Sequence, residues 1–417
     1  MKIAVVGAGI VGIAAAFELT LDGHEVTVYE KNASVAELSS FATGTLLAPS
    51  LTQPFSHMAW PQSNSLVRLL RHLKLVPISN VLNHAVWKWL LAWSAAKPVD
   101  SFTEGFAASS KLISLSLERM RFVCHDMQIE FEQSTGQLIL AQSGPEQKCH
   151  QAKLAALKAL EVNHQILDAQ GIANAEPSLN QAAVDQDALF FPGDTVGNCR
   201  QFTQLLKDRA VQSGAHMLFN STVTGIHAGA QIEIAVAGQP PQAFDKVVVC
   251  TGHAPSELVA PLKLKVPGTI AHSYSLSAQM REPLNGPRNA VFESKRGISI
   301  ARIGSRVRAI GGTHLGKPSK RSEKKAQDML YRAIQHYFPG AASMSSSTQF
   351  WTGSTWITND SLPVIGESAV PGVYLNMGHG FNGWGMACGA ARVLADEIAN
   401  GKPAPEFSRL SPKRFSY

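Results

Sequence analysis

A glycine-rich segment near the N-terminus constrains the fold of this chain more than any other feature. Residues 3–6 read as a short buried strand, and the run GAGIVG at residues 7–12 follows directly and opens an alanine-rich helix. A second strand is expected over residues 25–29, with Glu30 at its end. Strand, glycine turn, helix, strand and acid in this order form the fingerprint of a dinucleotide-binding βαβ unit. The segment therefore predicts a Rossmann-like α/β domain.

Each part of this fingerprint has a physical role. Gly7 permits the tight turn, Gly9 lets the backbone approach a pyrophosphate, and Gly12 allows the helix to pack closely on the strand. The helix N-terminus offers N–H groups and the positive end of a dipole to phosphates. Glu30 is placed to accept hydrogen bonds from ribose hydroxyls. Because NAD and FAD share an ADP half, the motif alone leaves the choice between them open.

The composition limits the class of protein. With 417 residues, 45% hydrophobic and 16% charged, the chain is globular and can bury a sizeable core. The formal net charge of +6 suggests an anionic ligand, a lipid headgroup or an acidic partner. No nucleic-acid-reading motif is visible, so we expect no nucleic-acid partner.

The cysteines and the N-terminus indicate the compartment. The five cysteines are far apart and show neither C-x-x-C nor zinc-ligand spacing, so we expect no disulfide framework and no metal. We expect no cleavable signal peptide and no membrane-spanning segment, since no window approaches the ~20 apolar residues that a span needs. These features predict a cytoplasmic protein, and a peripheral position on the inner face of the cytoplasmic membrane stays open.

The later part of the chain favours FAD over NAD as the cofactor. Strands are expected at 221–226, 247–249 and 373–376, well beyond the end of a simple NAD domain. A glycine-rich turn at 378–385 then leads into a helix that continues to Ile398. Such a turn can hold a flat ring system close to the backbone, and the helix N-terminus can stabilise negative charge that develops on the ring.

Several segments together resemble one enzyme family. The chain is similar to the D-amino-acid dehydrogenase branch (small-subunit type) of the FAD-dependent D-amino-acid oxidase/glycine oxidase family. The resemblance is carried by the fingerprint with Glu30 and by segments in the family's order over nearly the whole chain: SSFATGTLLAPS at 39–50, GQLIL at 136–140, PGDTVGNCRQFTQLL at 192–206, SYSLS at 273–277, RIGSRVRAIGGTH at 302–314, WTGSTWITNDSLPVIG at 351–366 and GHGFNGWGMACG at 378–389.

The resemblance implies noncovalent FAD and a set of cofactor-binding residues. The ADP half would lie on the fingerprint, the adenine side near the backbone of Val223, and the flavin between the second loop and the C-terminal glycine turn. The residues assigned in this way are Gly7, Gly9, Ile10, Val11, Gly12, Glu30, Lys31, Ser39, Ser40, Ala42, Thr43, Leu47, Val223, Thr251, Gly252, Gly380, Asn382, Gly383 and Trp384.

The resemblance also implies two interleaved domains. The FAD-binding domain would consist of residues 1–60, 196–256 and 350–417, and the substrate-binding domain of residues 61–195 and 257–349. The latter would be built on a mixed or antiparallel sheet. For it we expect helices at 103–126 and 152–162, and strands at 136–140, 272–280, 298–303 and 306–311.

The substrate side departs from the family at one position. Where the family carries a Gly-x-Arg-Pro turn whose arginine clamps the substrate carboxylate, this chain reads GSTW at 353–356, with Thr355 in place of the arginine. A threonine cannot grip a carboxylate bidentately. Arg302 is our candidate for the cation that binds the carboxylate instead. The alternative is that Arg302 is an ordinary surface arginine. Tyr274 is either a substrate hydrogen-bond donor or a core aromatic, and Trp356 either lines the pocket or packs in the core.

The implied chemistry is the oxidation of an amine. A neutral amine of an amino acid, most simply a D-amino acid, would deliver hydride from its α-carbon to flavin N5. The resulting imine would be hydrolysed to an oxo acid and ammonia, and the electrons would pass to a quinone or another acceptor. His379 is either a general base or a brace for the flavin turn. An oxidase that uses O₂, such as a glycine or sarcosine oxidase, and a flavoprotein partner subunit acting on a protein-bound substrate are the alternatives.

A tryptophan-rich segment allows two interpretations. Trp87, Trp89 and Trp93 lie close to Lys88 and Lys97. Tryptophan beside lysine suits a membrane interface, whereas the same pattern fits an amphipathic helix packed on the substrate domain. The sequence indicates no particular oligomeric state.

Overall fold

The fold is described from a computed structural model. It covers residues 1–42, 46–47, 86–87, 89–91, 100–140, 163–184, 187–229, 231–252, 258–264, 266–294, 296–343 and 348–415. In this part of the chain, the strands form a six-stranded sheet, a ten-stranded sheet and a small three-stranded sheet.

The six-stranded sheet contains the strands on either side of the glycine-rich segment. Its order is β18-β19-β11-β1-β2-β7, and all neighbours run parallel except β18, which runs antiparallel to β19. The carboxyl ends of the parallel strands meet at one edge, where open α/β sheets bind ligands. The strands are β1 (Lys2–Val6), β2 (Glu25–Tyr29), β7 (His216–Leu218), β11 (Lys246–Val249), β18 (Val364–Glu367) and β19 (Val373–Met377).

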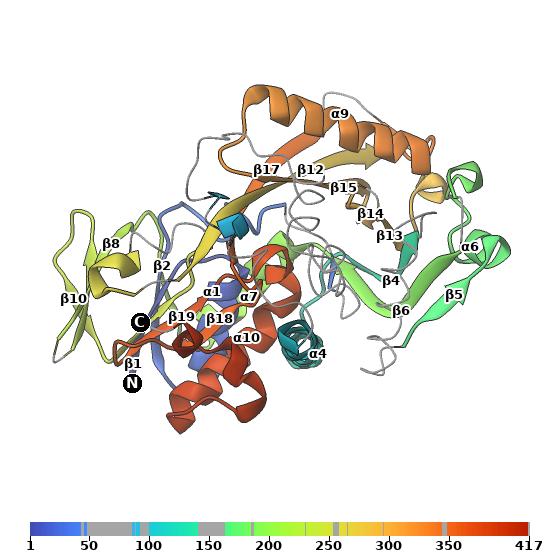
Figure 1. Cartoon of the computed structure of the whole chain (residues 1–417). Coiled ribbons are helices and arrows are strands. Elements are labelled where there is room, and N and C mark those ends of the chain that lie inside the picture. The colour runs from blue at the N-terminus through green and yellow to red at the C-terminus, as the bar shows by residue number, and fades with distance from the viewer. Residues whose placement is uncertain are drawn as a thin grey trace.

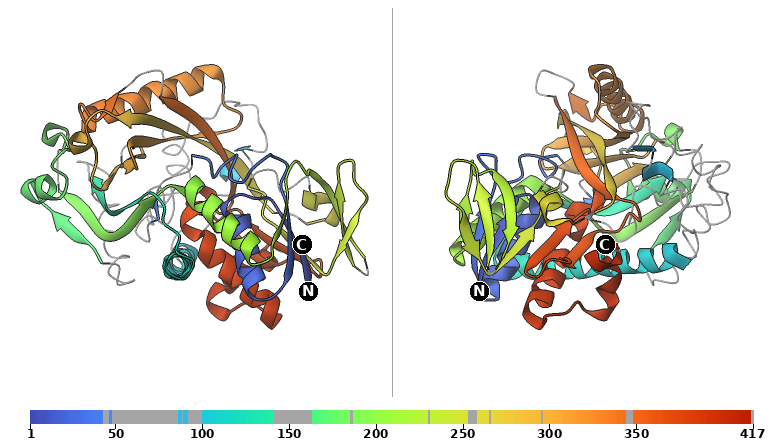
Figure 2. Two further views of the ribbon diagram at one scale, coloured as in Figure 1. Left: turned by 180° about the vertical axis from the view of Figure 1, so that it is seen from behind. Right: turned by 60° about the vertical axis from the view of Figure 1, so that its left-hand side comes forward.

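Both faces of this sheet are covered, which explains its nearly continuous apolar strands. Ile3 and Val5 face a helical layer, whereas Ala4 and Val6 face the three-stranded antiparallel sheet. Figures 1 and 2 show the six-stranded sheet between these two layers. The helices are α1 (Ile10–Leu21), α4 (Asp100–Asp126), α7 (Cys199–Gln212) and α10 (Gly383–Asn400), and the small sheet consists of β8 (Val223–Ala228), β9 (Ile232–Val236) and β10 (Gln242–Phe244).

A buried carboxylate joins three of the helices. Glu18 of α1 is 1% exposed, and its two oxygens accept hydrogen bonds from Arg119 of α4 at 2.6 and 2.9 Å. Arg392 of α10 donates to the same carboxylate at 2.9 Å and also binds the Asp22 carboxylate at 2.6 Å. Because Glu18 is the shared partner, this network fixes α4 and α10 against α1.

The ten-stranded sheet is mixed and follows the order β16-β12-β15-β14-β13-β4-β6-β3, with β17 paired to β12 and β5 paired to β6. Only β13 and β4 run parallel among its described pairs. Its strands are β3 (Leu46–Leu47), β4 (Gln133–Leu140), β5 (Gln165–Leu167), β6 (Ala188–Gly197), β12 (Gly268–Met280), β13 (Ala290–Glu293), β14 (Ile298–Ile303), β15 (Arg306–Leu315), β16 (Ala342–Ser343) and β17 (Gln349–Thr358).

One helix covers the outer face of this sheet. α9 (Lys320–Tyr337) begins with a capping box at Ser319 and packs Leu330 and Ile334 on the sheet (Figure 1). Tyr274 and Leu276 of β12 face α9, so the alternation of a strand turns Ser273, Ser275 and Ser277 to the opposite face. Further helical segments are α6 (Ala169–Ala175) and short 3₁₀ turns at Gln181–Ala183, Ala260–Leu262, Pro283–Asn285, Gly380–Asn382, Pro405–Leu410 and Pro412–Arg414.

The structure confirms the α/β fold class and most of the expected elements. The helix expected at 103–126 is α4, and the strands expected at 136–140, 272–280, 298–303 and 306–311 are β4, β12, β14 and β15. The helix expected at 152–162 lies outside the described residues. α10 ends before Gly401, whose φ of +71° is left-handed.

The domain division of the sequence analysis stays a prediction, and two elements differ from it. β17 pairs with β12 in the ten-stranded sheet, although the boundary at 350 assigns it to the cofactor-binding part. α4 packs against α10 and is joined to α1 by the Arg119–Glu18 ion pair, although it was assigned to the substrate part. Both elements connect the two parts, because β18 follows β17 directly and the Glu18 network holds α4.

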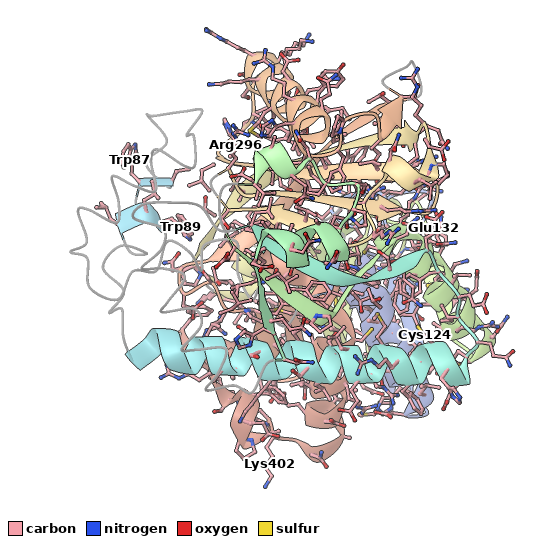
Figure 3. The ribbon with its side chains drawn as sticks, turned by 90° about the vertical axis from the view of Figure 1, so that its right-hand side faces the viewer. Trp87, Trp89, Cys124, Glu132, Arg296 and Lys402 are labelled. Carbon is pink, nitrogen blue, oxygen red and sulfur yellow. The ribbon has the colours of Figure 1, made fainter. Side chains whose placement is uncertain are left out.

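The tryptophan segment packs on the protein. Trp89 is 2% exposed and Leu90 is fully buried, and they contact Ala271, Leu315 and Ile357. Figure 3 shows Trp87 and Trp89 on the short helical piece that makes this contact. For Trp89 the packed-helix interpretation is therefore correct, and the membrane-interface interpretation is not supported; Trp93, Lys88 and Lys97 lie outside the described residues. Among the helices that the structure describes, none has the length and apolar run to cross a membrane.

The Glu18 network makes a prediction for stability. Replacing Glu18 with Gln leaves two partly buried arginines facing a neutral amide, so the free energy of unfolding should fall by about 3–5 kcal/mol. As a control, Asp396→Asn removes a more exposed partner of Arg392 and should cost less than about 1 kcal/mol. Chemical denaturation of the three proteins measures both values. Equal effects of the two substitutions would contradict this assignment.

Candidate active site

A cleft of about 740 Å³ lies where the carboxyl-end edge of the six-stranded sheet meets the inner face of the ten-stranded sheet. Its volume falls within the range of about 300–1,000 Å³ that ligand sites occupy. The lining residues come from several parts of the chain that are distant in sequence. They are Val6, Gly7, Gly9–Val11, Tyr29–Asn32, Ala36–Ser40, Ala42, Ser221–Thr224, Cys250–Gly252, Leu258, Ser273, Gly353–Thr355, Asn376–Phe381, Gly383 and Trp384.

Two of the three glycines of the fingerprint, Gly7 and Gly12, lie in close backbone contacts. A Cβ on Gly12 would stand 1.8 Å from the carbonyl oxygen of Gly7 and 3.3 Å from the Cβ of Cys250. Gly7 has a φ of +105°, which L-residues rarely adopt, and a Cβ there would lie 3.0 Å from the Cys250 carbonyl oxygen. Gly12 therefore packs α1 on the strand ends, and Gly9 opens into the cleft beside Ser40.

The side chains of Glu30 and Ser40 hydrogen-bond to the backbone of the glycine-rich segment. The Glu30 carboxylate accepts hydrogen bonds from the Ala8 N–H at 2.8 Å and from the Asn32 N–H at 2.9 Å. This holds the carboxylate at the cleft, with lone pairs left for ribose hydroxyls. The Ile10 N–H at the start of α1 donates to the Ser40 hydroxyl at 3.1 Å, so the loop that contains Ser40 is held at the helix N-terminus.

Several buried polar atoms along the cleft have no partner among the described residues. They are the Thr251 hydroxyl, both side-chain atoms of Asn376, Nε2 of His379 and Nε1 of Trp384. A buried polar group without a partner costs about 1–3 kcal/mol. Donors and acceptors of this kind are what the polar edges of a flavin and its ribityl chain need. The volume, the glycine cradle and these atoms fit FAD.

His379 is a neutral histidine at physiological pH. It lies at the start of the Gly380–Asn382 turn, and burial lowers its pKa to about 4. The shift disfavours protonation, so His379 is a weak base at pH 7. The low pKa supports the interpretation that His379 holds the turn in place over the interpretation that it is a general base.

Thr355, which stands where the resemblance predicts an arginine, is hydrogen-bonded to the Gly380–Asn382 turn. Its hydroxyl donates to the carbonyl oxygen of Gly380 at 2.8 Å. The neighbouring Trp356 N–H donates to the Gly252 carbonyl at 3.0 Å, and the Ser39 hydroxyl donates to the Ser354 carbonyl. β17 is thus bonded to three segments that line the cleft. The indole of Trp356 lies against Gly268, so it packs between strands and does not line the cleft.

Two of the expected catalytic residues lie away from the cleft. Arg302 is exposed at the end of β14, where its Nε donates to the Gly304 carbonyl at 3.0 Å. Tyr274 is 2% exposed, faces α9 and stacks on Phe350 at 5.8 Å between ring centres. The expectation that they bind substrate needs correction, because the alternation of β12 points Tyr274 outward and Arg302 projects into solvent beyond the covered part of β14.

The expected cofactor-binding residues largely come together. Most of them line the cleft, including Lys31, Ser39, Val223, Thr251 and Gly252. Gly12 instead packs beneath it, Leu47 is 1% exposed in the core, and Asn382 does not line it. Thr43 lies outside the described residues. Whether these residues contact the cofactor stays a prediction.

Sequence reasoning missed several lining residues. Asn376 is fully buried, and a lone asparagine in the apolar strand VYLNM was a signal that could have identified it. Ser273 and Gly353 lie opposite each other on β12 and β17, and nothing local marks either of them.

In the described part of the chain, no group of three or more His, Cys, Asp or Glu side chains could hold a metal ion. The thiols of Cys124, Cys199, Cys250 and Cys388 are free, and burial raises their pKa, to about 11 for Cys124 and about 12 for Cys199. Cys149 lies outside the described residues.

The fold and cleft define a dinucleotide-binding α/β protein with a second sheet facing the ligand. Residues 2–397 match the model of the FAD dependent oxidoreductase (DAO) family. The chain therefore belongs to this family and is an FAD-dependent oxidoreductase, which confirms the resemblance seen in the sequence.

Curated relatives and solved structures agree with this membership. The chain is 29% identical to a D-amino acid dehydrogenase of Bradyrhizobium diazoefficiens, with 100% of this chain and 99% of the relative covered. It is 31% identical to one of Cereibacter sphaeroides, with 100% and 95% covered. Glycine oxidase from Geobacillus kaustophilus has a similar fold, with a TM-score of 0.77, 19% identity and full coverage of both chains.

The contact at Gly12 predicts how FAD binding depends on it. Gly12→Ala forces α1 away from the Gly7 carbonyl, so the FAD dissociation constant should rise at least about tenfold, the equivalent of ~1.4 kcal/mol. Gly193→Ala is the control, because a Cβ at Gly193 meets nothing within 4 Å. Fluorescence titration of the apoproteins measures both constants. Wild-type affinity in Gly12→Ala would contradict this role.

Burial of His379 predicts a loss of stability in acid. The pKa rises from about 4 in the folded state to the ordinary 6.5 in the unfolded chain. The unfolded state therefore binds more protons between these values, and stability falls as the pH drops from 6.5 toward 4. Between pH 7 and about pH 4.5, the low pKa of His379 in the folded state should reduce the free energy of unfolding by ~2–3 kcal/mol.

The measurement is chemical denaturation of wild type and His379→Gln at both pH values, with FAD saturating. The variant should lose ~2–3 kcal/mol less on acidification, while the remaining acid sensitivity persists because burial also lowers the pKa of His314. An identical pH dependence of the two proteins would show that His379 is not buried in its neutral form.

Proposed function

We propose that this protein oxidatively deaminates an amino acid, most simply a D-amino acid, and passes the electrons to a quinone or another acceptor. The observation that carries the proposal is the cleft itself, which joins the fingerprint and Glu30 to the inner face of the ten-stranded sheet. Family membership and the name of the curated relatives, D-amino acid dehydrogenase, support it.

We propose further that FAD is held without a covalent bond. Among the described lining residues, His379 is the only histidine and Cys250 the only cysteine. His379 is 9% exposed and Cys250 6% exposed, and burial raises the pKa of the Cys250 thiol. A thiol kept protonated is a poor nucleophile, which favours noncovalent binding.

The chain's own residues would bind and orient both molecules. Gly7, Gly9 and Glu30 would hold the ADP half, and Asn376 and Trp384 would meet the polar edges of the ring. When bound, FAD supplies a hydride acceptor for the substrate carbon that bears the nitrogen. The protein would position the substrate amine and exclude water, so that only the released imine is hydrolysed, to an oxo acid and ammonia. His379, neutral at pH 7, would brace the Gly380–Asn382 turn.

A second candidate is an oxidase that uses O₂. The structural likeness to glycine oxidase from Geobacillus kaustophilus favours it, although at 19% identity this likeness shows the fold alone. The dehydrogenase is the stronger proposal, because the curated relatives of that name match over the full length of the chain at 28–31% identity.

Anaerobic reduction of the bound flavin tests the proposed function. In a panel of D-amino acids, L-amino acids, secondary amines and simple amines, D-amino acids should bleach the flavin absorbance fastest. In air, an artificial electron acceptor should then sustain turnover at least about tenfold faster than oxygen forms hydrogen peroxide. If no amino acid in the panel bleaches the flavin, the proposal is wrong; if peroxide forms as fast as the acceptor is reduced, the oxidase is the correct alternative.

A further inference from the structure

A second concave site, outside the cleft, is lined mostly by cations. It is a groove of about 710 Å³ formed by α9 and by the turn that joins β13 to β14. Five of its lining side chains are lysine or arginine and one is a carboxylate, in a chain whose formal net charge is +6. A large share of the excess charge therefore lies at one place. The lining residues, which we call the basic groove, are Arg296, Arg321, Lys324, Lys325, Asp328, Met329, Arg332 and His336.

The charges of the basic groove are not balanced by the protein. Asp328 is its single acidic residue, and its carboxylate pairs with Lys324 at 3.6 Å. None of the other lysines and arginines of the groove forms an ion pair with a residue that the structure describes. The charged side chains are all exposed, so solutes reach them from solvent. Unbalanced cations around one concave space concentrate anions there.

The placing of these cations on α9 works against the stability of the helix. Arg321 and Lys325 are four residues apart and are neighbours on the helix surface, where two like charges are unfavourable. Arg321 also lies in the first turn of α9, where the helix dipole disfavours a cation. A helix face that is merely solvated usually alternates the two signs of charge. Such departures from local preference are typical of functional sites, and a bound anion would relieve the repulsion.

A second element brings another arginine to the same space. Arg296 lies in the turn between β13 and β14, and its backbone N–H donates to the Glu293 carboxylate at 3.1 and 3.3 Å. Glu293 is 1% exposed, so this bond fixes the turn to the core of the sheet. The Arg296 side chain lines the groove together with the cations of α9. Cations from two separate elements therefore surround one site.

We propose that the basic groove binds a soluble ligand that carries two or more phosphate groups. A guanidinium binds a phosphate through two parallel hydrogen bonds, and Arg296, Arg321 and Arg332 provide three such groups. The volume is within the range of about 300–1,000 Å³ of small-molecule sites. Among the described lining residues, the imidazole of His336 is the only ring on which a base could stack. The phosphate chain is therefore the part of the ligand that the groove recognises.

The basic groove is distinct from the site expected for FAD. None of its lining residues lines the cleft. The inference therefore does not depend on the substrate that the enzyme oxidises, and it can fail while the proposed function holds. Its test uses the holoenzyme with FAD saturating, so that the phosphate-binding start of α1 is already occupied.

Calorimetric titration of the holoenzyme with inorganic triphosphate at low ionic strength tests the inference. One triphosphate should bind per chain. Arg296→Gln and Arg332→Gln should each raise its Kd about tenfold, the equivalent of ~1.4 kcal/mol, because each loses a charge-assisted contact. Arg332→Lys should raise the Kd only about threefold, since the charge remains and the fork is lost.

The matched control is Lys402→Gln, which also removes one exposed positive charge. Figure 3 shows Arg296 and Lys402 near opposite ends of the molecule. The Kd of Lys402→Gln should stay within about twofold of wild type, because salt screens charges over that distance. If Lys402→Gln weakens binding as much as Arg332→Gln does, the anion responds only to net charge and the inference is wrong. The same holds if the wild-type holoenzyme binds no triphosphate.

A sedimentation assay with phosphatidylglycerol vesicles separates a free ligand from a lipid headgroup. The wild-type holoenzyme should sediment with these vesicles no more than Arg332→Gln does, because a concave groove on one helix fits a small solute and not a flat surface. If the vesicles retain wild type but not Arg332→Gln, and triphosphate does not bind, the groove is a membrane contact and the inference is overturned. The altered side chains are exposed, so each variant should keep the melting temperature of wild type without triphosphate.

Discussion

The close contact between α1 and the end of β1 is the constraint on which the site depends. Gly12 lies against the Gly7 carbonyl, where a Cβ would stand at 1.8 Å, so the helix can approach the sheet only because this side chain is absent. The contact aims the start of α1 at the cleft and positions Ser40, which binds the Ile10 N–H. The Glu18 network then anchors α4 and α10 on the same helix, and α10 places Trp384 in the cleft. The Glu18–Arg392 bond thereby joins residues that are 374 positions apart in sequence.

The second constraint is the two-faced β12–β17 pair. One face of these strands packs under α9 and is apolar; the other carries serines, Gly353 and Thr355 toward the cleft. Bonds from Thr355 to Gly380 and from Trp356 to Gly252 lock this face onto the cofactor loops. The strand pair therefore serves both as the outer core of one sheet and as a wall of the cleft, so β17 connects the two parts of the molecule.

Features that depend on residues close together in the sequence could be predicted from it, whereas features that depend on the pairing of distant strands could not. The fingerprint, Glu30 and the C-terminal glycine turn are local patterns, and the structure brings them to one cleft. Ser273 and Gly353 come together only through the register between two distant strands, which no local period reveals. Arg302 shows the limit of a local pattern. Alternation correctly grouped it with Ile298 and Ile300 on one face of β14. That face is covered by α9, however, and Arg302 lies at its uncovered end.

We propose that the ADP half of FAD lies on the Gly7–Gly12 segment and Glu30, while the ring meets α10 and β17. Calorimetric titration of the flavin-free protein with FAD and with FMN, which lacks the adenylate half, tests this arrangement. One FAD should bind per chain, and FMN should bind at least about 100-fold more weakly, since about 2.7 kcal/mol is a modest share for the dinucleotide contacts. Equal affinities for FMN and FAD would show that the fingerprint does not hold the ADP half.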